Sequence, residues 1–166
     1  MTAVLLAPSA VRILGIDPGS RITGYGVIEA SAGRSRCIAH GVIRLDPDDA
    51  MPQRLLALLR ELRALIQTQR PQEVAIEEVF VRRNVASALV LGQARGAAIC
   101  AVAEAGLPLH EYAPASIKLA VAGNGRAEKP QIQQMVKVLL NLPAIPAADA
   151  ADALACALCH AHSRTM

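Results

Sequence analysis

The chain has 166 residues, of which 53% are hydrophobic and 19% charged, and its net charge at pH 7 is +3. This length supports one full hydrophobic core and is too short for two ordinary domains. The composition excludes a largely disordered protein. The four cysteines are too sparse for a disulfide framework, which favours a reduced, cytoplasmic protein. No uninterrupted apolar run approaches the roughly 20 residues that span a bilayer.

The first residues predict an extension ahead of the folded domain. Residues 1–10 lack the basic start and the long apolar run of a secretory signal. We therefore expect a disordered N-terminal extension over 1–10, followed by a single domain over 11–166.

A short run rich in β-branched residues, 11–16, predicts a buried strand that ends at Asp17 and a Pro18-Gly19 turn. Asp17 would then stand at the carboxyl end of the strand, where open α/β sheets place their ligand sites. An aspartate before Pro-Gly can also simply cap a turn, and this alternative stays open for Asp17 taken alone.

The remaining chain predicts an α/β protein. Three strands of hairpin type come first, with a turn at 31–33, and later strands alternate with helices, which implies a mixed five-stranded sheet flanked by helices. The further strands are expected at 23–30, 36–45, 73–78 and 108–112. The helices are expected at 51–69, 84–105 with Asn84 as N-cap, 114–121, 130–140 and 147–161.

The predicted helix over 84–105 carries two glycines on one face. Gly92 and Gly96 are four residues apart, a spacing that lets another backbone approach closely. Gln93 and Arg95 argue against a membrane helix. Two partners remain open: a second copy of the chain, or the protein's own sheet.

Three further carboxylates have positions that suit a shared site with Asp17. Glu77 ends the predicted fourth strand as Asp17 ends the first, so both should reach one edge of the sheet. Asp149 and Asp152 are three residues apart on one face of the last helix, within an alanine- and leucine-rich segment that should pack inward. Acids in a first helical turn also serve as ordinary partners of the helix dipole, so this reading remains open for the pair.

Carboxylates that converge on a partly buried spot repel one another, and a divalent cation removes the conflict. Oxygen ligands without histidine or cysteine favour Mg²⁺ or Mn²⁺ over Zn²⁺. Two such ions about 3.5–4 Å apart form a standard apparatus for cutting a phosphodiester, in which one activates water and the other stabilises the leaving oxygen.

Four segments, in order and without a large gap, resemble the RuvC family of bacterial Holliday-junction resolvases. The resemblance runs from about Arg12 to His162. The matching segments are Gly15-Ile16-Asp17-Pro18-Gly19-Ser20 with Thr23-Gly24-Tyr25-Gly26, Ala75-Ile76-Glu77-Glu78-Val79-Phe80, Leu91-Gly92-Gln93-Ala94-Arg95-Gly96, and Ala148-Asp149-Ala150-Ala151-Asp152-Ala153-Leu154-Ala155.

The resemblance implies an RNase H-like fold and a homodimeric, Mg²⁺-dependent endonuclease that cuts two opposed strands of a four-way DNA junction. It implies two metal ions per active site, with Mn²⁺ as a substitute, and partnership with the RuvA and RuvB branch-migration proteins. By matching motif, the catalytic metal ligands would be Asp17, Glu77, Asp149 and Asp152. Lys118, Lys129 and Phe80 match positions where the family contacts DNA, and Arg82 and Arg83, next to Phe80 in the same basic loop, would complete the DNA-contacting residues. Each of the two lysines could also be an ordinary solvated side chain, and Phe80 could instead belong to the core.

Several other functions are compatible with parts of the sequence. A nuclease of the YqgF type, acting on ribosomal RNA precursors, shares the fold, and a junction-binding dimer without cleavage is a non-enzymatic alternative. The segment Gly15-Ile16-Asp17 before a hairpin also occurs in actin-like and Hsp70-like ATPases, but these need two such domains. Cys156-Ala157-Leu158-Cys159-His160 fits a c-type haem motif, and with His162 it could hold Zn²⁺, although all these residues crowd one helix end.

Overall fold

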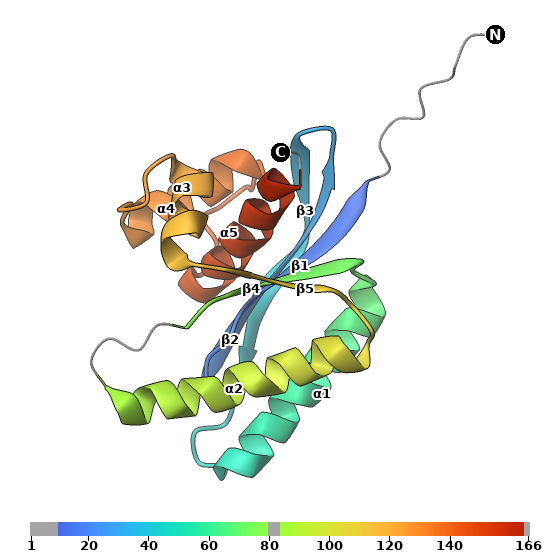
Figure 1. Cartoon of the computed structure of the whole chain (residues 1–166), viewed down its shortest axis with the longest axis vertical. Coiled ribbons are helices and arrows are strands. Elements are labelled where there is room, and N and C mark those ends of the chain that lie inside the picture. The colour runs from blue at the N-terminus through green and yellow to red at the C-terminus, as the bar shows by residue number, and fades with distance from the viewer. Residues whose placement is uncertain (1–9, 80–83, 165–166) are drawn as a thin grey trace, which may run out of the picture.

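The computed structural model describes residues 10–79 and 84–164, and a five-stranded mixed sheet forms its centre (Figure 1). The strand order is β3-β2-β1-β4-β5; β1 pairs antiparallel with β2 and parallel with β4. The strands are β1 (Val11–Asp17), β2 (Ile22–Ser31), β3 (Arg34–Arg44), β4 (Glu73–Glu77) and β5 (Leu109–Tyr112). The expected mixed five-stranded sheet is therefore confirmed. The predicted N-terminal extension, apart from Ala10, lies outside the described residues.

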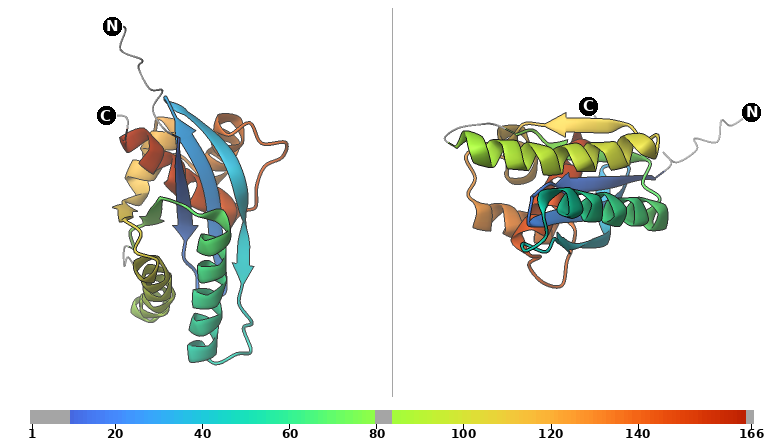
Figure 2. Two further views of the ribbon diagram at one scale, coloured as in Figure 1. Left: turned by 90° about the vertical axis from the view of Figure 1, so that its right-hand side faces the viewer. Right: turned by 90° about the horizontal axis from the view of Figure 1, so that it is seen from below.

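Helices cover both faces of this sheet (Figure 2). One layer holds α1 and α2, and the other is built on α5, with α3 and α4 packed against it. The helices are α1 (Met51–Gln69), α2 (Val85–Glu104), α3 (Pro114–Ala122), α4 (Lys129–Leu139) and α5 (Ala148–Ser163). Every predicted helix is present, and its ends lie within two residues of those expected.

Two local signals act as the sequence predicts. The β2–β3 hairpin turns at Ala32 and Gly33, both with positive φ, the geometry of a type I′ turn whose twist suits the flanking strands. Asn84 caps α2, because its side-chain oxygen accepts a hydrogen bond of 3.1 Å from the backbone N–H of Ser87.

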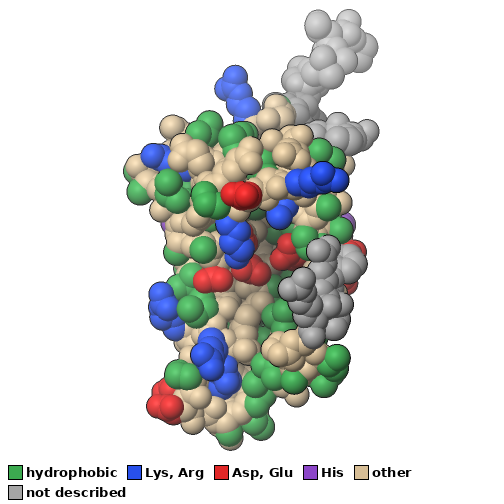
Figure 3. All heavy atoms as spheres, turned by 90° about the vertical axis from the view of Figure 1, so that its left-hand side faces the viewer, with side chains coloured by type: hydrophobic (Ala, Val, Ile, Leu, Met, Phe, Trp, Pro, Cys, Tyr) green, Lys and Arg blue, Asp and Glu red, His purple; other side chains and the backbone are tan. Residues whose placement is uncertain are grey.

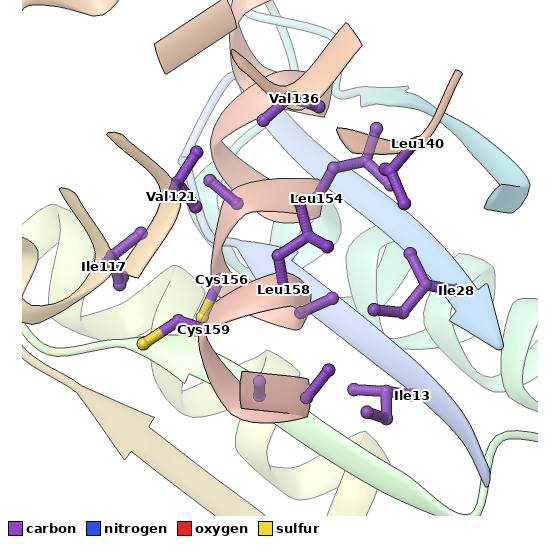
Figure 4. Packing of buried hydrophobic residues seen from close by; sticks show 14 of the residues in the cluster. Ile13, Ile28, Ile117, Val121, Val136, Leu140, Leu154, Cys156, Leu158 and Cys159 are labelled. Atoms are coloured by element: carbon purple, nitrogen blue, oxygen red, sulfur yellow. The ribbon is translucent and has the colours of Figure 1, made fainter. Parts of the chain in front are cut away.

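Alternation along the strands divides the core in two. On β1, Ile13 packs toward α5, whereas Leu14 and Ile16 pack toward α1 and α2. Figure 4 shows the α5 side, where Leu154 and Leu158 of the helix lie over Ile28 and Ile13 of the sheet. Residues at odd positions of β1 therefore face α5, and Asp17 is one of them.

Glycines in β1 and β2 bring α5 unusually close to the sheet. A Cβ added to Gly15 would collide with the backbone carbonyl of Ala153, and one added to Gly24 would collide with that of Asp149. At Gly26 the obstacle is the side chain of Leu154. Because the helix backbone rests directly on these strands, its first turns are fixed relative to the end of β1.

We predict that Gly24→Ala separates α5 from β2. The new methyl group meets rigid backbone, so we expect a loss of about 1–3 kcal/mol in the free energy of unfolding, measured by urea denaturation. Gly125→Ala is the matched control, because a Cβ there makes only ordinary contact with Ala115. Equal stability of the two variants would show that the close approach at Gly24 is not a constraint.

Candidate active site

The sheet places Asp17 and Glu77 side by side. Ile16 of β1 pairs with Ile76 of the parallel strand β4, so the residues that follow them reach the same level. On β4, Val74 and Ile76 pack toward α1 and α2, whereas Ala75 belongs to the α5 side. Glu77, two residues beyond Ala75, therefore faces α5, as Asp17 does.

The first turns of α5 bring the other two acids to this point. Asp149 lies in the first turn, and its backbone carbonyl rests on Gly24, which pairs with Asp17 across β1 and β2. Asp152 lies one turn further along the same face of the helix. Asp149 and Asp152 are each partly buried, although the rest of α5 between Ala150 and Ala161 is buried.

Burial and the mutual repulsion of the acids raise the pKa of two of them, Asp17 and Glu77. Burial and the carboxylates of Asp152, Glu77 and Asp149 raise the pKa of Asp17 to about 7. Burial and the charge of Asp152 also raise the pKa of Glu77 above its ordinary value. The four acids therefore form one electrostatically coupled group.

Two lysines stand beside the acids. The Lys129 ammonium donates a hydrogen bond of 3.2 Å to Asp152, and the negative charge of Asp152 raises the pKa of Lys129. Lys129 is nevertheless largely exposed, so this ion pair is a weak and exchangeable contact. Lys118 of α3 lines the same cleft as Asp17 and Glu77, and its charge acts to lower the pKa of Glu77.

Two of the four acids, Asp17 and Glu77, line a cleft of about 500 Å³. Acidic side chains gather near the middle of this face, with lysine and arginine side chains above and below them (Figure 3). The cleft is lined by Asp17, Pro18, Glu77, Glu78, Val79, Leu91, Ala113, Pro114, Ala115 and Lys118.

Of the predicted site residues, the structure brings together the four acids and the two lysines. Phe80, Arg82 and Arg83 lie outside the described residues, so their predicted contacts with DNA stay predictions.

Sequence reasoning missed two residues that hold the site in place. The buried hydroxyl of Thr23 donates to the carbonyl of Gly19 and accepts from its N–H, which closes the turn after Asp17. Arg95 of α2 donates to the backbone carbonyl of Glu77 and to the Glu111 carboxylate. An arginine inside a very apolar helix was the available signal for Arg95, whereas a threonine in a strand is too common to be one.

The residues present suit a hard divalent cation. All four candidate donors are carboxylates, and Mg²⁺, Mn²⁺ and Ca²⁺ prefer oxygen ligands. The raised pKa of Asp17 is a second sign of fit, because a cation would offset the repulsion that favours its protonated form.

The order of strands, the helices on both faces and the acids at the ends of β1 and β4 define the class of RNase H-like nucleases. Within that class the chain belongs to the RuvC family, since the family model "Crossover junction endodeoxyribonuclease RuvC" matches residues 13–160. Members of this family are nucleases that depend on divalent metal, and the resemblance seen in the sequence is thus confirmed.

Individual relatives are similar over nearly the whole chain. The RuvC proteins of Alkalilimnicola ehrlichii and Halorhodospira halophila are 57% and 56% identical, covering 93% of this chain and 93% and 92% of their own. Thermus thermophilus RuvC, solved in complex with a Holliday junction substrate, is 35% identical, with a TM-score of 0.87 over 93% of this chain and 96% of that one. The yeast mitochondrial Holliday junction resolvase Ydc2, at 15% identity and a TM-score of 0.66, shares the fold, covering 97% of this chain and 83% of its own.

The raised pKa of Asp17 predicts a pH dependence of stability without metal. Folding raises this pKa from 3.8 to about 7, so between these values the folded chain binds more protons than the unfolded chain. The contribution of Asp17 to the free energy of unfolding therefore falls as the pH rises from the unfolded to the folded pKa. In EDTA, Asp17→Asn should raise the melting temperature by a few degrees at pH 8 and have little effect at pH 4.

Asp49→Asn, at an exposed position, is the control and should leave the melting temperature unchanged at both pH values. An Asp17→Asn variant that is no more stable than the unmodified chain at pH 8 would mean that the four acids do not strain the metal-free fold.

Proposed function

We propose that this chain resolves four-way DNA junctions by symmetric, metal-dependent cleavage of two opposed phosphodiester bonds during recombination and repair. The observation that carries this proposal is the clustering of Glu77, Asp149 and Asp152 around Asp17, whose pKa all three raise, beside a cleft lined by Asp17 and Glu77. Membership of the RuvC family supports the choice of DNA junction over other substrates of RNase H-like nucleases. The similarity to a RuvC solved with its junction substrate supports it further.

The four carboxylates would hold two Mg²⁺ ions, for which Mn²⁺ could substitute. When bound, the ions supply an activated water and stabilise the leaving oxygen of the cut strand. The chain itself supplies the fixed positions of the carboxylates, through the close contact of α5 with β1 and β2. Asp17 must lose its proton to take part, and its pKa near 7 makes that step sensitive to pH near neutrality.

Lys118 and Lys129 are proposed to bind the phosphate backbone beside the acids. Lys129 offsets part of the negative charge of Asp152 in the free protein, and its exposed ammonium can move to a phosphate when DNA arrives. Lys118 of α3 and Leu91 of α2 both line the cleft. Phe80, Arg82 and Arg83 complete the proposed DNA surface from sequence similarity alone.

The direct test is a cleavage assay on a synthetic four-way junction with Mg²⁺. We expect paired, symmetric cuts by the unmodified chain and none by Asp17→Asn, since removing one carboxylate disables the cation site. Junction binding, measured by gel shift, should be retained or tightened because a negative charge near phosphate is removed.

Other outcomes would replace the proposal. Binding without cuts in the unmodified chain would make it a non-cleaving junction-binding dimer, and preferential cutting of structured RNA would favour the YqgF-like nuclease. Full nicking by Asp17→Asn would remove Asp17 from the mechanism.

A homodimer is proposed as the active form, because two symmetric cuts match the two-fold symmetry of the junction. Its interface is proposed to be an apolar stripe on α2 formed by Val85, Leu89, Gly92 and Gly96. Val85 and Leu89 are 68% and 66% exposed, which is unusual for large apolar side chains. This stripe is on the opposite side of the helix from Ala94, which is buried against the rest of the chain.

The two glycines favour a second copy over the protein's own sheet as their partner. A Cβ added to Gly92 or Gly96 would meet nothing within 4 Å. Neither glycine is therefore needed for contacts among the described residues. Each leaves a shallow place on the stripe where another helix can approach.

By length and composition α2 could also cross a membrane, and it is the one helix of the described residues of which this holds. The contacts of Arg95 with Glu77 and Glu111 tie the helix to the sheet instead. We therefore propose that the protein is cytoplasmic and works with RuvA and RuvB.

Gly96→Leu should break the dimer while leaving the fold intact, since there is open space for the side chain on the isolated chain. We expect a monomer in analytical ultracentrifugation and loss of paired cuts. Ala64→Leu, on the exposed side of α1, adds the same side chain away from the stripe and should stay dimeric. A dimeric Gly96→Leu variant would place the interface elsewhere.

A further inference from the structure

A second polar cluster lies at the other end of β4 from the candidate active site. Glu73 begins β4 and Glu77 ends it, so about 13 Å of strand separates them. Like Glu77, Glu73 is on the α5 side of the sheet. Its neighbours are His110 of β5 and His160 near the end of α5.

His160 is the buried centre of this cluster, with only 3% of its side chain exposed. Its Nε2 lies 2.5 Å from Oε2 of Glu73, and its Nδ1 lies 2.6 Å from the hydroxyl of Tyr112. The other oxygen of Glu73 accepts a hydrogen bond from Arg164. The ring of His110 stacks on that of His160, with 4.2 Å between the centroids.

The ligand atoms of Glu73, His110 and His160 all lie within 4.8 Å of one another. We propose that these three side chains form a Zn²⁺ site that fastens the end of α5 to β4 and β5 and is separate from the four acids. The ligand set favours the choice of metal, and the hydrogen bonds around the cluster favour the ligands and their orientation.

Two imidazoles and one carboxylate are a ligand set typical of Zn²⁺, with a water in the fourth position. Mg²⁺ avoids nitrogen ligands, so the two sites of the chain should select different metals. In tetrahedral Zn²⁺ sites with bonds of about 2.0–2.1 Å, neighbouring ligand atoms are about 3.3 Å apart. To reach that distance the Glu73–His160 pair, now 2.5 Å apart, would open slightly, and any pair that is further apart, at up to 4.8 Å, would close.

His110 has a nitrogen to offer. Within the described residues its side chain takes part in ring stacking but forms no hydrogen bond. A partly buried histidine without a hydrogen-bond partner is unusual among polar side chains near a core. A metal ligand role would satisfy it.

The other two ligands are already oriented by second partners, as metal ligands commonly are. The Tyr112 hydroxyl can accept a hydrogen bond from Nδ1–H of His160, and in that tautomer Nε2 keeps its lone pair for the metal. Arg164 holds the outer oxygen of Glu73, so Oε2 faces the histidines. Burial lowers the pKa of His160, which favours the neutral form of its ring.

The nearby cysteines do not compete for this role. Cys156 and Cys159 are buried in α5, and burial raises the pKa of both thiols, so neither is a ready thiolate ligand. The zinc set suggested by the local sequence, Cys156, Cys159, His160 and His162, is thus replaced by one in which His160 uses partners distant in the sequence. A haem attached at the same cysteines would require them to be accessible.

The experiment is a titration of the full chain with ZnCl₂, followed by calorimetry. The chain is first stripped of metal and then placed in about 5 mM Mg²⁺, which occupies the four acids. We expect one Zn²⁺ per chain with a dissociation constant below about 10 µM, and a higher melting temperature when it is bound. His110→Ala should weaken binding at least about tenfold, because it removes a ligand and leaves the hydrogen bonds of His160 in place.

Two further variants separate this site from other zinc-binding groups. His40→Ala, at an exposed histidine of β3, should bind as tightly as the unmodified chain. Asp17→Asn should do so as well, which assigns the zinc to the cluster rather than to the four acids. Glu73→Gln should lose binding as His110→Ala does, and it is the second ligand variant if His110→Ala fails to fold.

Failure of the unmodified chain to bind Zn²⁺ more tightly than about 10 µM in Mg²⁺ would overturn the proposal, whatever the variants do. Equal binding by the unmodified chain and a folded His110→Ala or Glu73→Gln variant would also overturn it. Neither result bears on junction cleavage, which depends on residues at the other end of β4.

Discussion

The close contact between the backbone of α5 and the glycine-bearing strands is the constraint on which the rest of the structure depends. Four carboxylates repel one another, and nothing in their own interactions would hold them together without a cation. The helix holds them, because all of its residues from Ala150 to Ala161 except Asp152 are buried against the sheet and the neighbouring helices. Apolar burial along the helix thus offsets an electrostatic cost at its first turn. The site is set up by packing before any ligand arrives.

Much of the fold followed from local sequence patterns. The β-branched run at 11–16, the apolar spacing of residues 51–69 and the cap at Asn84 act through neighbours close in the chain, so their outcome could be predicted. The nearness of Asp17 and Glu77 was also predictable, because parallel strands bring their carboxyl ends to one edge.

Contacts between residues far apart in the sequence could not be predicted in this way. No pattern near Gly24 indicates that it rests on the backbone of Asp149. His160 has Glu73 as a partner, 87 residues away in the sequence, and the local cysteine motif does not indicate this contact. The contact of Thr23 with Gly19 is local, only four residues apart, but a threonine in a strand is too common a residue to signal it.

Arg95 and Gly96 are consecutive residues of α2, yet they serve different surfaces of the helix. Arg95 reaches inward to the carbonyl of Glu77, while Gly96 belongs to the outer stripe proposed to meet a second copy. Only the width of α2 would then separate each subunit boundary from the end of the catalytic strand. In such an assembly, rigid helices and strands would fix the distance between the two active sites. The spacing of the two cuts would then be a property of the protein, to which a flexible DNA junction must conform.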